Sequence, residues 1–150
     1  MELVHVNSKN GGQATHEEVR DGDMVLAVII RASFCEPGIN FFSQPHFSQQ
    51  LGFIKHSTGH TIAPHVHNPV PREVVYTQEA LFIRRGSVRV DLYRQDRTFL
   101  TSRFLSTGDV ILLAEGGHGF EILEDSEIIE VKQGPYTGDA DKTRFERARG

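Results

Sequence analysis

The sequence predicts an all-β protein built from short antiparallel strands, and three observations support this fold class. Short apolar runs rich in Val, Ile and Leu recur at roughly 8–12-residue intervals, separated by turn residues. Glycine occurs 14 times in 150 residues, above the average share of about 7%, which favours many turns. No long stretch carries the hydrophobic repeat of an amphipathic helix. The pattern is typical of a β-sandwich or a small barrel.

Two segments define the expected strands best. Met24–Ile30 is short, apolar throughout and rich in β-branched residues, as in a buried strand. Ser87–Tyr93 alternates, with Val88, Val90 and Leu92 on one face and polar residues on the other, as in a half-buried antiparallel strand. Further strands are expected at residues 51–56, 79–84, 98–105, 110–113, 120–123 and 127–132. At residues 15–21 a capping pattern predicts one helical turn at most.

Length and composition restrict the class of protein. A chain of 150 residues corresponds to a single domain, 1–150, and its net charge of −4 without a basic block argues against nucleic-acid binding. The longest apolar run is far shorter than the roughly 20 residues that span a bilayer, so no membrane partner is expected. Residues 1–5 lack the features of a secretory signal. The single cysteine, Cys35, excludes an internal disulfide framework. We therefore expect a cytoplasmic protein.

The segment 33–50 holds four of the ten phenylalanines and three breaker residues. The favoured interpretation is a loop that its aromatic side chains hold against the core; a pocket lid and a dimer contact are the alternatives. Because this segment and Met24–Ile30 precede the central motifs, where an added strand could reach a second subunit, we expect a homodimer. The charged residues 139–150 are expected to form a surface tail.

The chemistry concentrates around His65 and His67, which are separated by one residue. If this segment is a strand, residues i and i+2 project from the same face, and the two imidazoles point to one place. Imidazole is a ligand for Zn, Fe, Cu and Ni, commonly with a carboxylate as a third partner. The pair alone is weak evidence, because it also occurs on solvated strands. His56 and His60 lie nearby as reserve ligands or hydrogen-bond donors.

The surrounding spacing resembles the two motifs of the cupin family. Gly59 is followed by five residues and then His65 and His67, and Glu79 is followed by six residues and then Gly86, as in the first cupin motif. The second motif is matched by Gly108, five residues, and the stretch 114–118 with its histidine. The resemblance covers about residues 51–131.

The resemblance implies a cupin-type antiparallel β-barrel, or double-stranded jelly roll, that binds one divalent transition metal inside. The metal could be Fe, Mn, Ni, Cu or Zn. Carried over position by position, the implied ligands are His65, His67, Glu79 and His118. Leu81, Ile83, Val88 and Val90 are expected to line the apolar interior around them.

The motifs depart from the family pattern at three places. The gap between His67 and Glu79 is eleven residues, longer than usual, and it contains a rival carboxylate ligand, Glu73. Glu79 is preferred because it shares the apolar register of its strand, where a buried carboxylate needs a partner. Ala114 replaces the motif proline, and a single residue separates Gly116 from His118. The same residues also fit a metal-free site in which Glu79 pairs with an arginine.

The sequence leaves three functions open, because cupins host many activities. The first is a small metalloenzyme acting on a small polar molecule, sugar-like or an oxo-acid, with Glu73, His118 or Tyr76 as candidate catalytic groups. The second is a non-catalytic ligand-binding or sensor cupin. The third follows from residues 128–136, which loosely resemble the closing strand of metal-independent sugar-nucleotide isomerases and suggest polysaccharide biosynthesis.

Overall fold

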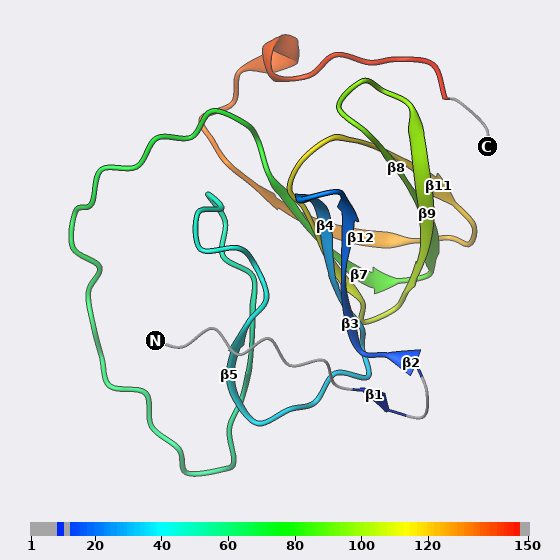
Figure 1. The fold of residues 1–150 in the computed structure, drawn as a ribbon. Coiled ribbons are helices and arrows are strands. Elements are labelled where there is room, and N and C mark those ends of the chain that lie inside the picture. The colour runs from blue at the N-terminus through cyan, green and yellow to red at the C-terminus, as the bar shows by residue number, and fades with distance from the viewer. Residues whose placement is uncertain (1–8, 11–12, 148–150) are drawn as a thin grey trace.

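The computed structural model describes residues 9–10 and 13–147, which form antiparallel β-sheets and no α-helix (Figure 1). The helical content of these residues is one 3₁₀ turn, η1 (Gly138–Asp141). The predicted all-β class is therefore confirmed. The expectations for residues 1–5 and for the last three residues of the charged tail lie outside the described residues.

Two sheets make up the body of the protein. The larger has five strands in the order β12-β7-β10-β4-β3, and the smaller has three in the order β11-β8-β9. The strands of the larger sheet are β3 (His16–Asp21), β4 (Met24–Ile30), β7 (Glu79–Arg85), β10 (Val110–Leu113) and β12 (Glu127–Lys132). Those of the smaller sheet are β8 (Ser87–Tyr93), β9 (Phe99–Ser106) and β11 (Gly117–Ile122). Two short hairpins, β1 (Lys9–Asn10) with β2 (Gln13–Ala14) and β5 (Gly38–Phe41) with β6 (Gly52–Lys55), complete the described strands.

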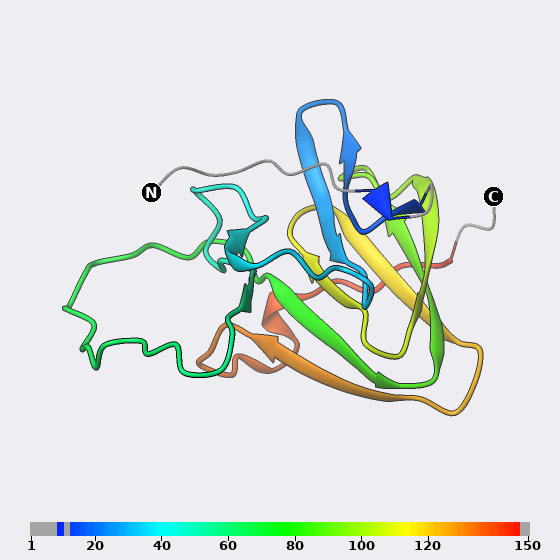
Figure 2. The same ribbon diagram turned by 90° about the horizontal axis from the view of Figure 1, so that it is seen from below.

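The larger and the smaller sheet face each other across an apolar core (Figure 2). The larger sheet contributes side chains from β3, β4, β7 and β10, and the smaller sheet contributes others from β8 and β9. Leu81, Ile83, Val88 and Val90 all belong to this core, as the alternation of their strands predicted. The strand order leaves each sheet with free edges, and the described strands do not close into a barrel.

The central strands of the larger sheet, β4 and β10, are buried on both faces. Along β4, Ile29 packs into the core between the sheets, whereas Val28 and Ile30 pack into a second apolar cluster on the opposite face. A strand covered on both sides has no solvent face, which explains why Met24–Ile30 is apolar throughout. Its place between β10 and β3 also makes it unavailable to a second subunit.

The phenylalanine-rich segment supplies the cover of that opposite face. Phe34, Phe42 and Phe47 are buried, and the ring of Phe34 stands perpendicular to those of Phe42 and Phe53 with centroids 5.0 Å apart in both pairs. Edge-to-face contacts of this kind are favourable between aromatic rings. The favoured interpretation of a loop held against the core is confirmed. The homodimer stays a prediction, and these three phenylalanines no longer serve as its basis.

Most strand bounds agree with the sequence expectations, because alternation and turn residues are local signals. The helical turn expected at residues 15–21 was wrong: His16–Asp21 forms β3, which pairs along β4 at the edge of the larger sheet. Its polar residues fit an edge strand, where Glu17 and Glu18 form ion pairs with arginines. The capping pattern misled here, because pairing of the segment with the strongly apolar strand β4 determines its conformation.

Truncation of the cover should destabilise the fold. We expect Phe34→Ala to lower the free energy of unfolding by about 3–5 kcal/mol, because it removes a buried ring and leaves a cavity on the sheet. The matched control is Phe104→Ala in β9, where the ring is 63% exposed and the change should cost little. Urea denaturation of both variants checks this. Equal losses in the two variants would contradict the assigned packing.

Candidate functional site

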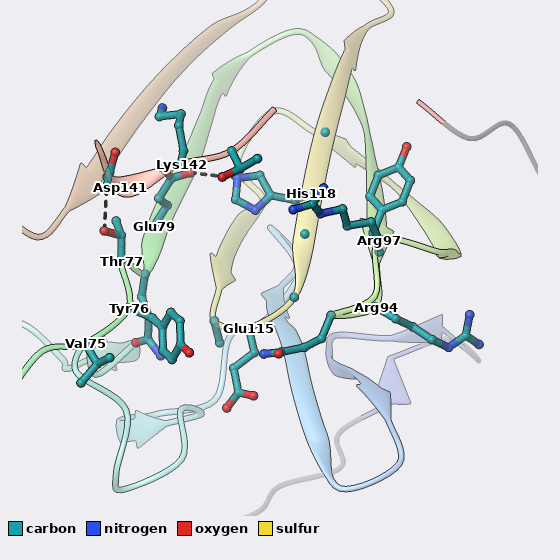
Figure 3. A pocket seen from close by; sticks show the side chains of 18 of the residues that line it. Val75, Tyr76, Thr77, Glu79, Arg94, Arg97, Glu115, His118, Asp141 and Lys142 are labelled. Carbon is teal, nitrogen blue, oxygen red and sulfur yellow. Dashed lines mark hydrogen bonds and ion pairs between the residues drawn. The ribbon is translucent and has the colours of Figure 1, made fainter. Parts of the chain in front are cut away.

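A cavity of about 890 Å³ opens at one end of the sandwich (Figure 3). Its walls come from six parts of the chain: residues 46–48, the end of the long loop 56–78, the start of β7, the turn between β8 and β9, residues 114–120 at the start of β11, and residues 141–147. We call residues 141–147 the strap, because they run past the cavity along the smaller sheet. Glu79 and His118 lie in this cavity together with Glu73 and Tyr76.

Strand register directs Glu79 and His118 into the cavity. Glu79 begins β7 opposite Leu113, and His118 lies in β11 opposite Leu92. Leu113 and Leu92 both belong to the core between the sheets, and residues directly opposite in an antiparallel pair share a face. The two polar side chains therefore point inwards from different sheets. They meet with Nε2 of His118 3.1 Å from Oε2 of Glu79.

The contact fixes how protons are arranged in the pair. The hydrogen bond from His118 holds the pKa of Glu79 below its usual value of 4.5; burial opposes this, and the charges of His118, Lys132 and Lys142 add to it. Glu79 is thus a carboxylate at neutral pH, and Nε2–H of His118 donates to it. Among the described residues, no hydrogen bond is made to Nδ1 of His118.

The structure places His65 and His67 elsewhere. Both lie in the loop 56–78, which extends away from the sheets in Figure 1, and both are exposed, with ring centroids 5.3 Å apart. The expectation that they share the face of a strand was wrong, because the segment forms no strand. Pro64, Pro69 and Pro71 lack the backbone N–H that a sheet ladder requires. His56 and His60 stack on each other in the same loop, with centroids 3.7 Å apart.

The four predicted metal ligands are thus brought together in part. Within the described part of the chain, no group of three His, Cys, Asp or Glu side chains is placed to hold a metal ion. Glu79 and His118 supply two donors that already bind each other. This arrangement does not fit a metal centre by itself, so we derive no chemical step through a metal. The four-ligand set stays a prediction.

Sequence reasoning missed the strap, which forms one wall of the cavity. Phe145 stands edge-on to Tyr93 with ring centroids 5.1 Å apart, and it lies against Gly117, where a Cβ atom would come within 3.0 Å of its ring. Glycine at that position lets the strap approach β11. Further along, the guanidinium of Arg147 binds the carboxylate of Asp91 in β8 and Glu121 in β11.

Asp91 shows why the strap is held firmly. The alternation of β8 placed it on the polar face, yet it is 3% exposed, because the strap covers that face. Burial would raise the pKa of Asp91, but hydrogen bonds from Ser102, Arg147 and Arg89 outweigh burial and lower it below its usual value of 3.8. Ser102 Oγ donates to Oδ1 at 2.6 Å and Arg147 Nε to Oδ2 at 2.7 Å. No signal of this cover is present in the sequence, because a polar residue on the outward face of an alternating antiparallel strand is ordinary.

Comparisons of the chain with protein-family models, curated proteins and solved structures each find no match. No helix among the described residues has the length and apolar character needed to cross a membrane. The assignment of a function therefore depends on the geometry of the cavity and on the spacing of the motif residues.

The strap should stabilise the fold in a pH-dependent way. We expect Asp91→Asn to lower the free energy of unfolding at neutral pH by about 1–3 kcal/mol, because a buried acceptor for three donors loses its charge. The folded-state pKa of Asp91 lies below the unfolded one, so this stabilisation is present above about pH 4 and is lost as the pH falls through the folded-state value. Urea denaturation of both proteins over this pH range measures the difference.

Asp139→Asn is the control, because Asp139 pairs with Arg144 at an exposed position, with both side chains more than three-quarters in solvent. That variant should unfold like the unaltered protein at every pH. A pH-independent cost of Asp91→Asn would show that the ionised carboxylate is not what binds the strap.

Proposed function

We propose that this protein is a cupin-like protein that binds a small polar molecule in the cavity and moves a proton with the His118–Glu79 pair. The observation that carries the proposal is the 3.1 Å contact between the two side chains at the cavity, with Nδ1 of His118 left open. The suggested substrates are sugar-like carbonyl compounds or oxo-acids. The proposed setting is the cytoplasm, and polysaccharide biosynthesis is one context.

The pair is suited to general acid–base chemistry. An imidazole can accept and release a proton near neutral pH, and a carboxylate hydrogen-bonded to its other nitrogen orients the ring and stabilises the imidazolium. Nδ1 of His118 would take a proton from a carbon beside a carbonyl group, leaving an enolate. The same nitrogen would return the proton to the neighbouring carbon while the hydroxyl proton moves to the former carbonyl oxygen, giving an isomer without any oxidant. Tyr76, which lines the cavity, is a candidate donor to the enolate oxygen.

The cupin assignment is supported by the motif spacing and by two facing antiparallel sheets. A jelly roll or barrel, the more specific fold that the cupin resemblance implies, fits this pair of sheets if the loop 56–78 packs against the end of the sandwich where the cavity opens. Glu79 and His118 come from the first and second motif, and they meet between the sheets as the resemblance implied for two of its four positions. This is the strongest structural support for the family resemblance.

Proton exchange with solvent tests the proposal without knowledge of the product. The protein is incubated in D₂O with a panel of aldoses, ketoses and 2-oxo acids, and the loss of C–H signals is followed by proton NMR. We expect His118→Asn to slow the exchange about 10²-fold or more and Glu79→Gln to slow it less.

His46→Asn is the matched control, because His46 lines the same cavity and its ring contacts Phe47 rather than Glu79. This variant should exchange protons at the unaltered rate. Binding of a panel member without any exchange would favour the alternative function, a non-catalytic ligand-binding or sensor cupin. Exchange that persists in His118→Asn would rule the histidine out as the base.

Metal binding is the second candidate function, and one observation favours it. The loop that carries His65 and His67 ends at the cavity, where residues 73–78 line the wall and lead directly into Glu79. Movement of this exposed loop could bring further donors to Glu79 and His118. The ion would be Fe, Mn, Ni, Cu or Zn, all of which accept imidazole and carboxylate ligands.

Elemental analysis of freshly purified protein measures the metal content. If the metal site exists, we expect His65→Ala to weaken binding by orders of magnitude, whereas His46→Ala leaves it unchanged. Comparison of Glu73→Ala with Glu79→Ala then identifies the carboxylate ligand. Unaltered metal content in His65→Ala would show that the long loop takes no part.

A further inference from the structure

The cationic side chains around the cavity differ in whether they are already neutralised. Five cations line it: Arg94, Arg97, Lys142, Arg144 and Arg147. Arg94 pairs with Asp21, Arg144 with Asp139, and Arg147 with Asp91 and Glu121. In the described residues, Arg97 and Lys142 form no ion pair. The lining also holds Glu73, Glu115 and Asp141, which form no ion pair in the described residues, so the cavity is mixed in charge. Arg97 and Lys142 are the cations of the lining that remain available to a bound anion.

Arg97 and Lys142 lie on either side of the histidine. Figure 3 shows Lys142 on the Glu79 side of the His118 ring and Arg97 on the opposite side in that view. Lys142 is close enough to Glu79 for its charge to act on that carboxylate. Arg97 extends from the turn between β8 and β9, and its guanidinium carbon lies 6.0 Å from the ring centroid of Phe145. The strap thus helps to hold Arg97 at the cavity.

The backbone at Arg97 adds a second observation. Its φ is +72°, in the left-handed region, where glycine is favoured and a longer side chain is strained. The turn is closed by a hydrogen bond from Arg97 N to Arg94 O at 2.9 Å, and glycine is the usual residue at this position of a hairpin. The side chain of Arg97 therefore destabilises the turn relative to glycine. Strained backbone positions of this kind are common at functional sites.

We infer that Arg97 and Lys142 form an oxyanion-binding subsite, so that the molecule held at His118 carries a phosphate or carboxylate group. This inference rests on the proposed function, because it names the substrate class of the same cavity. Arg97 offers a planar fork of N–H donors for two oxygens of the group, and Lys142 adds a point charge. Anchoring the anionic end would leave the carbonyl end of the molecule beside Nδ1 of His118.

Calorimetric titration with three related probes tests the subsite: glucose 6-phosphate, gluconate and glucose. We expect one or both anionic probes to bind more tightly than glucose, with an affinity that falls as salt rises. Comparison of the two anions shows whether phosphate or carboxylate is the preferred group. Arg97→Gly and Lys142→Gln should each weaken the anionic probes about tenfold or more and leave glucose unchanged.

Arg97→Gly is a clean variant, because glycine suits the turn. Its melting temperature should equal or exceed that of the unaltered protein, so lost binding cannot be blamed on unfolding. Arg84→Gln changes the net charge equally but lies outside the cavity, where Arg84 pairs with Glu127; it should bind every probe normally. Equal affinity for glucose and the anions, no binding of either anion, or unaltered binding in Arg97→Gly would each overturn the subsite.

The experiment separates this inference from the proposed function. Anion binding without proton exchange on the carbonyl panel would support the subsite and reject the proton transfer. Proton exchange on the carbonyl panel, together with unaltered binding of both anionic probes in Arg97→Gly, would support the proton transfer and reject the subsite.

Discussion

Burial of the central strands of the five-stranded sheet on both faces is the constraint on which the structure depends. The smaller sheet covers one face and the phenylalanine-rich segment covers the other, so the central strands contribute side chains to two apolar clusters. Each cluster needs the sheet as its common wall. Because β7 pairs with β10 and β12, the sheet also fixes where Glu79 begins its strand. The cavity is therefore a product of how the sheet is covered.

The cavity combines two kinds of support. Glu79 and His118 come from opposite sheets and are directed by strand register, which rigid backbone pairing maintains. The walls beside them come from the long loop, the turn at Arg97 and the strap, none of which belongs to a sheet. The sheets thus form a rigid scaffold for the His118–Glu79 pair, and the segments around it are irregular ones, the kind of structure that often carries binding residues.

The sequence predicted those parts of the fold that depend on local patterns. Alternation identified Val88 and Val90 as interior residues, and parity with Leu81 identified Glu79 as an inward carboxylate. The positions of His65 and His67 could not be derived in this way, because an exposed loop rich in proline has no buried face to set its register. The strap escaped prediction because its contact joins Arg147 to Asp91 across 56 residues, and the alternation of Ser87–Tyr93 placed Asp91 on the polar face of its strand.

The pairing of Asp91 with the strap has a consequence for how the protein assembles. The strap buries the Asp91 carboxylate and at the same time supplies Arg147 as its second guanidinium partner beside Arg89, so docking of the strap completes the smaller sheet electrostatically as well as sterically. Closure of the cavity wall and consolidation of the sheet are then a single cooperative event. Cleavage before Arg147 would accordingly produce a weakened fold rather than an intact protein with a more open cavity.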